Sequence, residues 1–299
     1  MIEIRSILCP IDFSETSRHA LEHALAIARW YDSEIVALHV VDLPLLPPLP
    51  ILSAAVGDPV VVQEQDHRRR AEEALHAWLE PHRPGVRADV LIGQGRPAAI
   101  VLDTARSRQS DLIVMGTHGL GGFERFMLGS VTEKVLRRAT CPVMTVPPAS
   151  QTAARVPYTR LVCPVDFSDS STAALQFAFS MAKEADASLT ILHVFEWPPD
   201  DDPLTQRFDV PAYRRALEEE ARGRLEALVP DEVKVWCRPS TKVAHGKPYR
   251  EILQVAEGEG ADLIVIGVHG RNALDLAVFG STTNQVVRRA SCPVLTLKH

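Results

Sequence analysis

The chain has 299 residues, of which 46% are hydrophobic and 23% charged, with a formal net charge of −6. This composition is that of a globular protein, and the negative charge argues against a surface that binds nucleic acid or an anionic membrane. The first residues lack the apolar run of a signal peptide, and the apolar segment 43–62 carries five prolines and Asp58. We therefore expect a cytoplasmic protein without a membrane-spanning helix.

Hydrophobic periodicity predicts alternating strands and helices along the first half of the chain. The short aliphatic runs predict strands at 2–9, 35–41, 86–92, 111–115 and 143–146. Apolar stripes at helical spacing predict helices at 14–31, 63–79, 97–107 and 130–138. The second half repeats this order from residue 161 to residue 297.

Strands that alternate with helices indicate a parallel sheet covered by helices on both faces. Because crossover connections are right-handed, five strands suggest the order 3-2-1-4-5 in each half. We therefore predict an α/β fold made of two tandem doubly wound five-stranded parallel-sheet domains. Ligands of such sheets bind beyond the carboxyl ends of the strands where the order reverses, which here lies between strands 1 and 4.

The two halves are copies of one unit. The sequence CPIDFS at 9–14 matches CPVDFS at 163–168, and LHV at 38–40 matches LHV at 192–194, both at an offset of 154. From residue 95 onward the offset is 151, so the second copy lacks three residues net in the intervening loops. We place the domains at 1–147 and 156–299, joined by a linker of small residues.

The same spacing of glycines, G-x2-G-x9-G-S, follows the fourth predicted strand of each half. Glycines between a buried strand and a helix start let backbone N–H groups surround an anion, and the helix dipole favours negative charge there. The repeated spacing therefore predicts two phosphate sites. Its members are Gly116, Gly119, Gly129 and Ser130 in the first half and Gly267, Gly270, Gly280 and Ser281 in the second.

Both halves resemble the universal stress protein family in its ATP-binding subgroup, over essentially the whole chain. In that family the glycine pattern binds ribose and phosphates, while an acidic residue after strand 1 and the backbone after strand 2 contact the nucleoside. The resemblance implies ATP in both domains, with Mg²⁺ held mainly by the phosphates. The implied site residues are Pro10, Asp12, Val40, Gly116, His118, Gly119, Gly129, Ser130 and Val131, and in the second domain Pro164, Asp166, Val194, Gly267, His269, Gly270, Gly280, Ser281 and Thr282.

The resemblance also assigns parts of the nucleotide to these residues. The acidic residue and the residue after strand 2 would hold adenosine, and the proline of the first turn would shape that turn. The first two glycines of the pattern would admit ribose and phosphates. Gly129, Ser130 and Val131 would present N–H groups to the phosphates, and the Ser130 hydroxyl would add a donor. Their counterparts would do the same in the second domain.

Several of these residues also have a purely structural interpretation. Asp12 and Asp166 could cap the helices that follow them, which is compatible with nucleotide contact. His118 and His269 are interpreted as ordering the glycine loop rather than as catalysts. Other histidines have structural explanations too: strand-end positions for His39 and His193, and a solvated helix face rather than a zinc site for the i, i+4 pair His19 and His23.

The pattern favours a ligand-binding protein over an enzyme. There is no P-loop and no G-x-S-x-G elbow, and no positioned base or phosphate clamp is evident, so we expect slow hydrolysis at most. The nucleotide would act as a regulatory ligand in a stress response, shifting a state that binds an unknown protein partner. Two alternatives stay open: an ATP-dependent transferase or ligase of the related adenosine-binding superfamily, and a dimerising scaffold with incidental nucleotide.

We also expect the two domains to pack as a pseudo-symmetric pair. Their short final strands, at 143–146 and 294–297, leave edges that can pair with each other. A homodimer of the whole chain is left open by the sequence.

Overall fold

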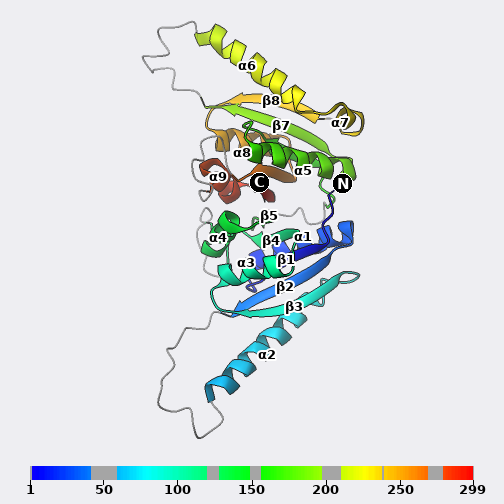
Figure 1. The fold of residues 1–299 in the computed structure, drawn as a ribbon, viewed down its shortest axis with the longest axis vertical. Coiled ribbons are helices and arrows are strands. Elements are labelled where there is room, and N and C mark those ends of the chain that lie inside the picture. Colours follow the sequence, from blue (N-terminus) through cyan, green and yellow to red (C-terminus); the bar gives the residue numbers. More distant parts are fainter. Residues whose placement is uncertain are drawn as a thin grey trace.

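The computed structural model describes residues 2–41, 59–119, 128–148, 156–196, 210–237, 239–268 and 279–298. Strands and helices alternate in both halves as predicted (Figure 1). The first half contains β1 (Ser6–Pro10), α1 (Glu15–Tyr31), β2 (Glu34–Val41), α2 (Pro59–Leu79), β3 (Arg87–Gln94), α3 (Pro97–Ser107), β4 (Leu112–Gly116), α4 (Ser130–Arg138) and β5 (Val143–Val146). The second half contains β6 (Arg160–Pro164), α5 (Asp169–Ala185), β7 (Ser188–Phe195), α6 (Val210–Ala227), α7 (Asp231–Trp236), β8 (Pro239–His245), α8 (Pro248–Gly258), β9 (Leu263–Gly267), α9 (Ser281–Arg289) and β10 (Val294–Leu297).

The strands form one ten-stranded sheet in the order β3-β2-β1-β4-β5-β10-β9-β6-β7-β8. The predicted order 3-2-1-4-5 is confirmed in each half, and the strands within a half are parallel. The halves join where β5 pairs with β10 in antiparallel register, with Leu295 opposite Met144. The final strands therefore form the predicted pseudo-symmetric seam between the domains, near the middle of the view in Figure 1.

Two threonines add side-chain hydrogen bonds to this seam. The Thr145 hydroxyl donates to the Val294 carbonyl at 3.2 Å, and the Thr296 hydroxyl donates to the Val143 carbonyl at 3.0 Å. Both side chains are buried, so each hydroxyl needs such a partner. The seam thus repeats one contact on both sides of its pseudo-twofold axis.

Helices cover both faces of the sheet because the strand residues are apolar on both sides. On one face, α1, α2, α5, α6 and α7 contribute to a buried cluster that includes Ile7 and Cys9 of β1. On the other face, α3, α4, α8 and α9 pack on a cluster that includes Leu8. Each cluster contains residues of both halves, so the core continues through the seam.

The first strand is shorter than the predicted strand at 2–9, because β1 begins at Ser6, where its pairing with β2 starts. Just before this point, the amides of Arg5 and Ser6 donate to the Asp111 carboxylate at 2.7 and 3.0 Å. In the second half Asp262 accepts from two amides in the same way (Thr159 and Arg160). A carboxylate distant in sequence thus fixes where each first strand starts.

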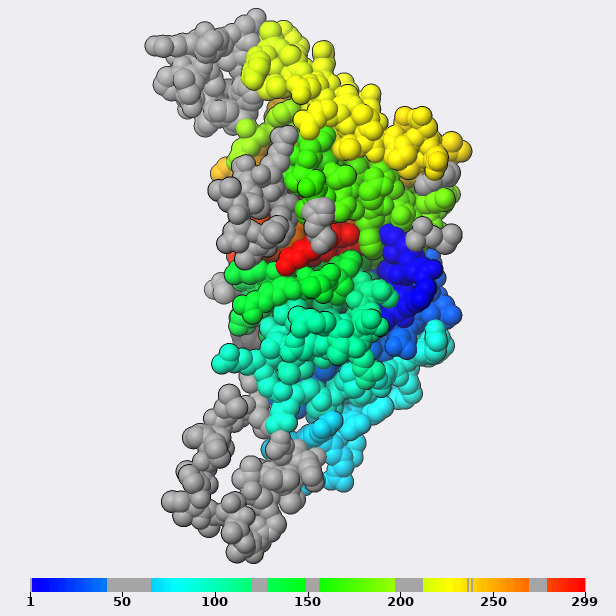
Figure 2. Space-filling model, viewed as in Figure 1, coloured from blue at the N-terminus to red at the C-terminus, as the bar shows by residue number. Residues whose placement is uncertain are grey.

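Residues near the N-terminus contact the second domain. The Ile2 amide donates to the Glu184 carboxylate of α5 at 3.2 Å, and the N-terminal residues (blue) lie beside the second domain in Figure 2. His23 of α1 is fully buried, with Nδ1 2.8 Å from the Tyr158 hydroxyl, which precedes β6. His23 is therefore not on the solvated helix face that the sequence suggested for it. Its Nδ1 belongs to a contact between the domains.

No helix in the described part of the chain is long and apolar enough to cross a membrane. Most of the proline-rich segment 43–62 lies outside the described residues, and α2 begins within it at Pro59. The linker expected between the domains also lies mainly outside them.

Candidate functional site

The turn after β1 places a carboxylate at the start of α1. Ser14 caps this helix, because its hydroxyl oxygen accepts from the Ser17 amide at 3.1 Å. Asp12 Oδ1 in turn accepts from the amide and the hydroxyl of Ser14, at 3.1 and 2.5 Å. Asp12 is therefore not the helix cap that one interpretation of the sequence gave it. It orients Ser14, which is the cap.

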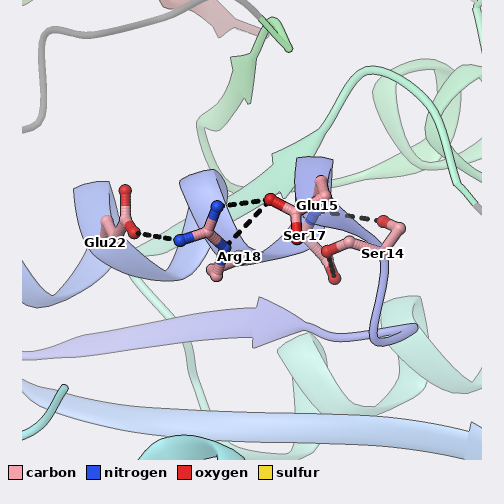
Figure 3. A network of polar contacts seen from close by, with 5 residues as sticks. All are labelled: Ser14, Glu15, Ser17, Arg18 and Glu22. Carbon is pink, nitrogen blue, oxygen red and sulfur yellow. Dashed lines mark hydrogen bonds and ion pairs between the residues drawn. The ribbon is translucent and has the colours of Figure 1, made fainter. Parts of the chain in front are cut away.

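Figure 3 shows the Ser14 cap and the ion pairs that follow it along the exposed side of α1. Arg18 donates from Nε to Glu15 at 3.1 Å and lies 3.5 Å from Glu22 through Nη1. Exposed pairs of this kind contribute little to stability, so the buried cap is what positions the first turn of the helix.

The second domain repeats this turn. Asp166 accepts from the amide and hydroxyl of Ser168 at 3.1 and 2.5 Å, and Ser168 accepts from the Ser171 amide at 3.2 Å. The residue between the acid and the cap has a positive φ in both copies, 62° at Phe13 and 63° at Phe167. A positive φ is costly for an aromatic residue, so the surrounding contacts must hold this turn in place.

A histidine of the second strand supplies one of these contacts. His39 Nδ1 lies 2.8 Å from the Ile11 carbonyl, and its ring centroid is 4.7 Å from that of Phe13. His193 makes the equivalent contact with Val165 at 2.7 Å. The structural interpretation of these two histidines is confirmed. These contacts hold the turn after strand 1 against the end of strand 2. Val40 and Val194 are the residues that follow the two histidines in that strand.

The loops after strands 1 and 4 meet in the first domain, as the topology predicts. A Cβ placed on Gly119 would lie only 2.4 Å from Asp12 Oδ2. This distance is below any real contact, so a side chain at this position would displace the carboxylate. Gly119 thus leaves one oxygen of Asp12 facing the loop after β4. In the second domain His269 and Gly270 lie outside the described residues.

The first glycine of each motif has a packing role that the sequence analysis did not include. A Cβ on Gly116 would lie 2.8 Å from Thr16 Cγ2, and one on Gly267 would lie 2.7 Å from the backbone carbon of Ser170. Both neighbours belong to the first turn of the helix after strand 1. The absent side chain therefore lets α1 and α5 cross close to the ends of β4 and β9.

The third glycine precedes a helix whose first turn is open. Gly129 and Gly280 are the N-caps of α4 and α9, and no side chain of the described residues caps either helix. The next residues, Ser130 and Ser281, are exposed. The first amides of a helix have no acceptor inside it, so such a terminus offers N–H donors and a positive field to an anion.

One detail of the predicted phosphate sites is wrong. The amide of Gly129 donates to the Thr117 carbonyl at 2.8 Å, and that of Gly280 donates to the Val268 carbonyl at 3.0 Å. These two N–H groups are therefore already bonded and are not presented to a phosphate. The N–H groups that remain candidates for a phosphate are those that follow, at Ser130 and Val131 in α4 and at Ser281 and Thr282 in α9.

Two threonines that sequence reasoning missed fix this helix start. The Thr132 hydroxyl donates to the Gly116 carbonyl at 2.9 Å, and the Thr283 hydroxyl donates to the Gly267 carbonyl at 2.8 Å. They tie the first turn of α4 and α9 to the end of the preceding strand. The signal was available, because the two residues are identical and stand at the repeat offset of 151.

The implied residues that the structure describes lie at the carboxyl end of the sheet in both domains. Pro10 ends β1, and Val40 lies in the neighbouring β2, with the same arrangement for Pro164 and Val194. Val131, the counterpart of Thr282, is partly buried in the first turn of α4.

Comparison with known proteins gives a consistent result. The model of the Universal stress protein family matches residues 3–147 and 157–298. A universal stress protein of Methanocaldococcus jannaschii is 33% identical over 144 residues, which cover 48% of this chain and 81% of the relative. Another, of Mycolicibacterium smegmatis, is 27% identical over 309 residues, covering 98% of this chain and 96% of the relative. The crystal structure of a universal stress protein from Archaeoglobus fulgidus shares the fold, with a TM-score of 0.68 at 23% identity over 99% of both chains.

Proposed function

We propose a function from the premise that the chain belongs to the universal stress protein family, as two tandem copies of its domain. Each copy binds ATP as a regulatory ligand. The nucleotide lies in the crevice between the loops after strands 1 and 4. The protein acts in the cytoplasm, where the bound state presents a surface to a protein partner.

The uncapped helix start is the observation that carries this proposal. Ser130 and Ser281 are exposed at the first position of α4 and α9, and the N-cap glycines Gly129 and Gly280 supply no side chain to the first amides of either helix. A phosphate group supplies the missing acceptors and the negative charge that the helix dipole favours. Both copies have this arrangement, so we expect two nucleotides per chain.

The turn after strand 1 supports the nucleoside end of the ligand. Asp12 uses one oxygen to hold Ser14, and its other oxygen faces Gly119. An amine or hydroxyl of a nucleoside is a suitable donor to that carboxylate. Val40, at the end of the adjoining strand, offers its backbone to the same group, and Asp166 and Val194 do so in the second domain.

The phosphates hold most of any Mg²⁺ that accompanies the nucleotide. Among the described residues, no cluster of three or more His, Cys, Asp or Glu side chains has the arrangement of a metal site. A cation bound mainly through phosphate oxygens needs no such cluster. Among the described residues no such cluster is present to position the cation for phosphoryl transfer, so we expect slow hydrolysis at most.

Blocking each helix start with a carboxylate tests the assignment. Ser130→Glu and Ser281→Glu place negative charge where the phosphates would lie, at exposed positions that accept a larger side chain. Gly280→Glu is less suitable, because its Cβ would be 2.8 Å from the Val268 carbonyl oxygen. ATP stoichiometry, measured by equilibrium dialysis, should fall from two to one in each variant and to zero in the double variant.

Gly223→Glu is the matched control, because a Cβ at this glycine of α6 meets nothing within 4 Å. It adds the same charge far from both helix starts and should leave two nucleotides bound. Unchanged stoichiometry in the double variant would overturn the proposed site. Rapid ATP turnover with a defined acceptor would favour a transferase or ligase, and partner binding that ignores ATP would favour a scaffold.

A further inference from the structure

The residue between strand β4 and the glycine loop differs between the two domains. In the first domain it is Thr117, whose hydroxyl lies 2.8 Å from Nδ1 of the adjacent His118. In the second domain it is Val268, which belongs to an apolar cluster. Both side chains are 2% exposed. Since valine and threonine have the same shape, the packing at this position does not require the hydroxyl.

The Thr117 hydroxyl favours one tautomer of the neutral His118 imidazole. If Thr117 donates its proton to Nδ1, the ring carries its own proton on Nε2, and only that N–H needs a further partner. In the other tautomer, Nδ1–H donates to the threonine oxygen. The buried hydroxyl proton and the Nε2 lone pair then both lack partners among the described residues. Because buried unpaired polar groups are costly, the first arrangement is favoured.

A charged imidazolium is disfavoured at the same place. Burial lowers the pKa of His118 below its usual 6.5, so the ring is neutral near pH 7. Its Nε2 is buried and has no hydrogen-bond partner within the part of the chain that the structure describes. A neutral ring held through Nδ1 therefore carries one N–H donor that no described residue accepts from.

This donor belongs to a residue that lies between the two halves of the candidate site. A Cβ on Gly129 would be 3.6 Å from the His118 Cα, so His118 adjoins the start of α4. The next residue along the chain, Gly119, adjoins the Asp12 carboxylate. A nucleotide that spans Asp12 and Ser130 therefore passes His118, and its phosphates bring acceptors for the Nε2–H group that the described residues do not supply.

We propose that Thr117 is a positioning residue: it holds His118 as the Nε2–H tautomer, which donates to a phosphate oxygen of the bound nucleotide. Val268 cannot orient His269 in this way, so the first site binds the nucleotide more tightly than the second. This inference rests on the proposed function and adds to it an unequal affinity of the two sites.

The tautomer can be observed directly. In the full-length protein with ¹⁵N-labelled histidine, two-bond ¹H–¹⁵N correlations distinguish Nε2–H from Nδ1–H rings, and the His118 signal is assigned by its loss in His118→Gln. We expect the Nε2–H form in the wild type and in Thr117→Ser, and a mixture of forms in Thr117→Val. An Nδ1–H ring in the wild type, or an unchanged spectrum in Thr117→Val, would overturn the proposal.

The affinity of each site can be measured with the other blocked. In a Ser281→Glu background, Thr117→Val should weaken ATP binding to the first site about tenfold, the usual worth of a hydrogen bond to a charged group. Thr117→Ser, which keeps the hydroxyl, should restore binding. In a Ser130→Glu background, Val268→Thr should strengthen the second site.

The outcomes separate this inference from the proposed function. If titration shows one ATP in each blocked background but Thr117→Val leaves the first-site Kd unchanged, the role of Thr117 is wrong while the sites stand. If the blocked backgrounds still bind two nucleotides, the site assignment itself fails. Failure of Thr117→Ser to rescue binding would mean that Thr117 acts through packing, and would also overturn the proposal.

Discussion

Acid should destabilise this protein through His23, a buried histidine at the contact between the domains. The side chain is fully buried in α1, and its Nδ1 lies 2.8 Å from the Tyr158 hydroxyl. Burial, with a smaller effect of the charge on His19, lowers the His23 pKa from 6.5 to about 4. Between these two pKa values, His23 therefore binds a proton in the unfolded chain but not in the folded chain.

The sign and size of the effect follow from linkage. Between pH 6.5 and about 4 the unfolded state binds more protons at this residue, so the free energy of unfolding falls as the pH falls through that window. At about 1.4 kcal/mol for each pKa unit, the full loss is about 3 kcal/mol. Above pH 6.5 the contribution is constant, and below pH 4 no more is lost.

Urea unfolding followed by tryptophan fluorescence at pH 7 and pH 4.5 measures this loss. His23→Phe installs the residue found at the equivalent position, Phe177, and should remove about 2–3 kcal/mol of the pH dependence. His23→Gln keeps a hydrogen-bonding partner for Tyr158 without the titration, so it separates the two effects. Other titrating groups contribute equally to wild type and variants. An equal fall in stability in all three proteins would refute the reasoning.

Three further predictions follow from the glycine and threonine contacts. Gly119→Ala should weaken ATP binding to the first site at least tenfold by calorimetry, because its Cβ would lie 2.4 Å from the Asp12 carboxylate that is proposed to hold the nucleoside. Gly267→Ala should lower the free energy of unfolding by about 1–3 kcal/mol in urea, since its Cβ would press against the backbone of Ser170. Thr145→Val should cost about 1 kcal/mol by the same measurement, because the buried seam loses its side-chain hydrogen bond to a carbonyl.

The chain offers matched controls for these variants. A Cβ at Gly223 or Gly258 would meet nothing within 4 Å, so alanine at either helical position should leave ATP binding unchanged and should not destabilise the fold. Full-affinity binding by Gly119→Ala would remove the contact between the loops from the site. Wild-type stability of Gly267→Ala or Thr145→Val would contradict the packing or the seam argument, respectively.

The sequence was sufficient for the architecture because aliphatic runs and helical stripes are local signals. It also predicted the two helix starts at which the candidate site lies, because Gly129 and Gly280 stand at the same offset in the two copies. It placed the start of β1 four residues too early, because that boundary depends on Asp111, about a hundred residues away in the chain. The extra helix α7 in the second half was not predicted either.

The assignment of individual donors was also beyond the sequence. Gly129 was expected to offer its amide to a phosphate, yet that amide bonds the Thr117 carbonyl. Thr132 was overlooked because its partner, the Gly116 carbonyl, is identified only by the fold. Such contacts depend on how a strand end and a helix start approach each other, which no local pattern records.

The seam between β5 and β10 has a consequence for how the two halves can change over time. In a homodimer of single domains, each substitution would appear twice and the assembly would depend on protein concentration. Here the linker keeps the halves together at a fixed high effective concentration, and their final strands are already occupied with each other. Each half can therefore accept its own substitutions, as the Thr117 and Val268 positions illustrate. The two different halves stay paired with each other because they belong to one chain.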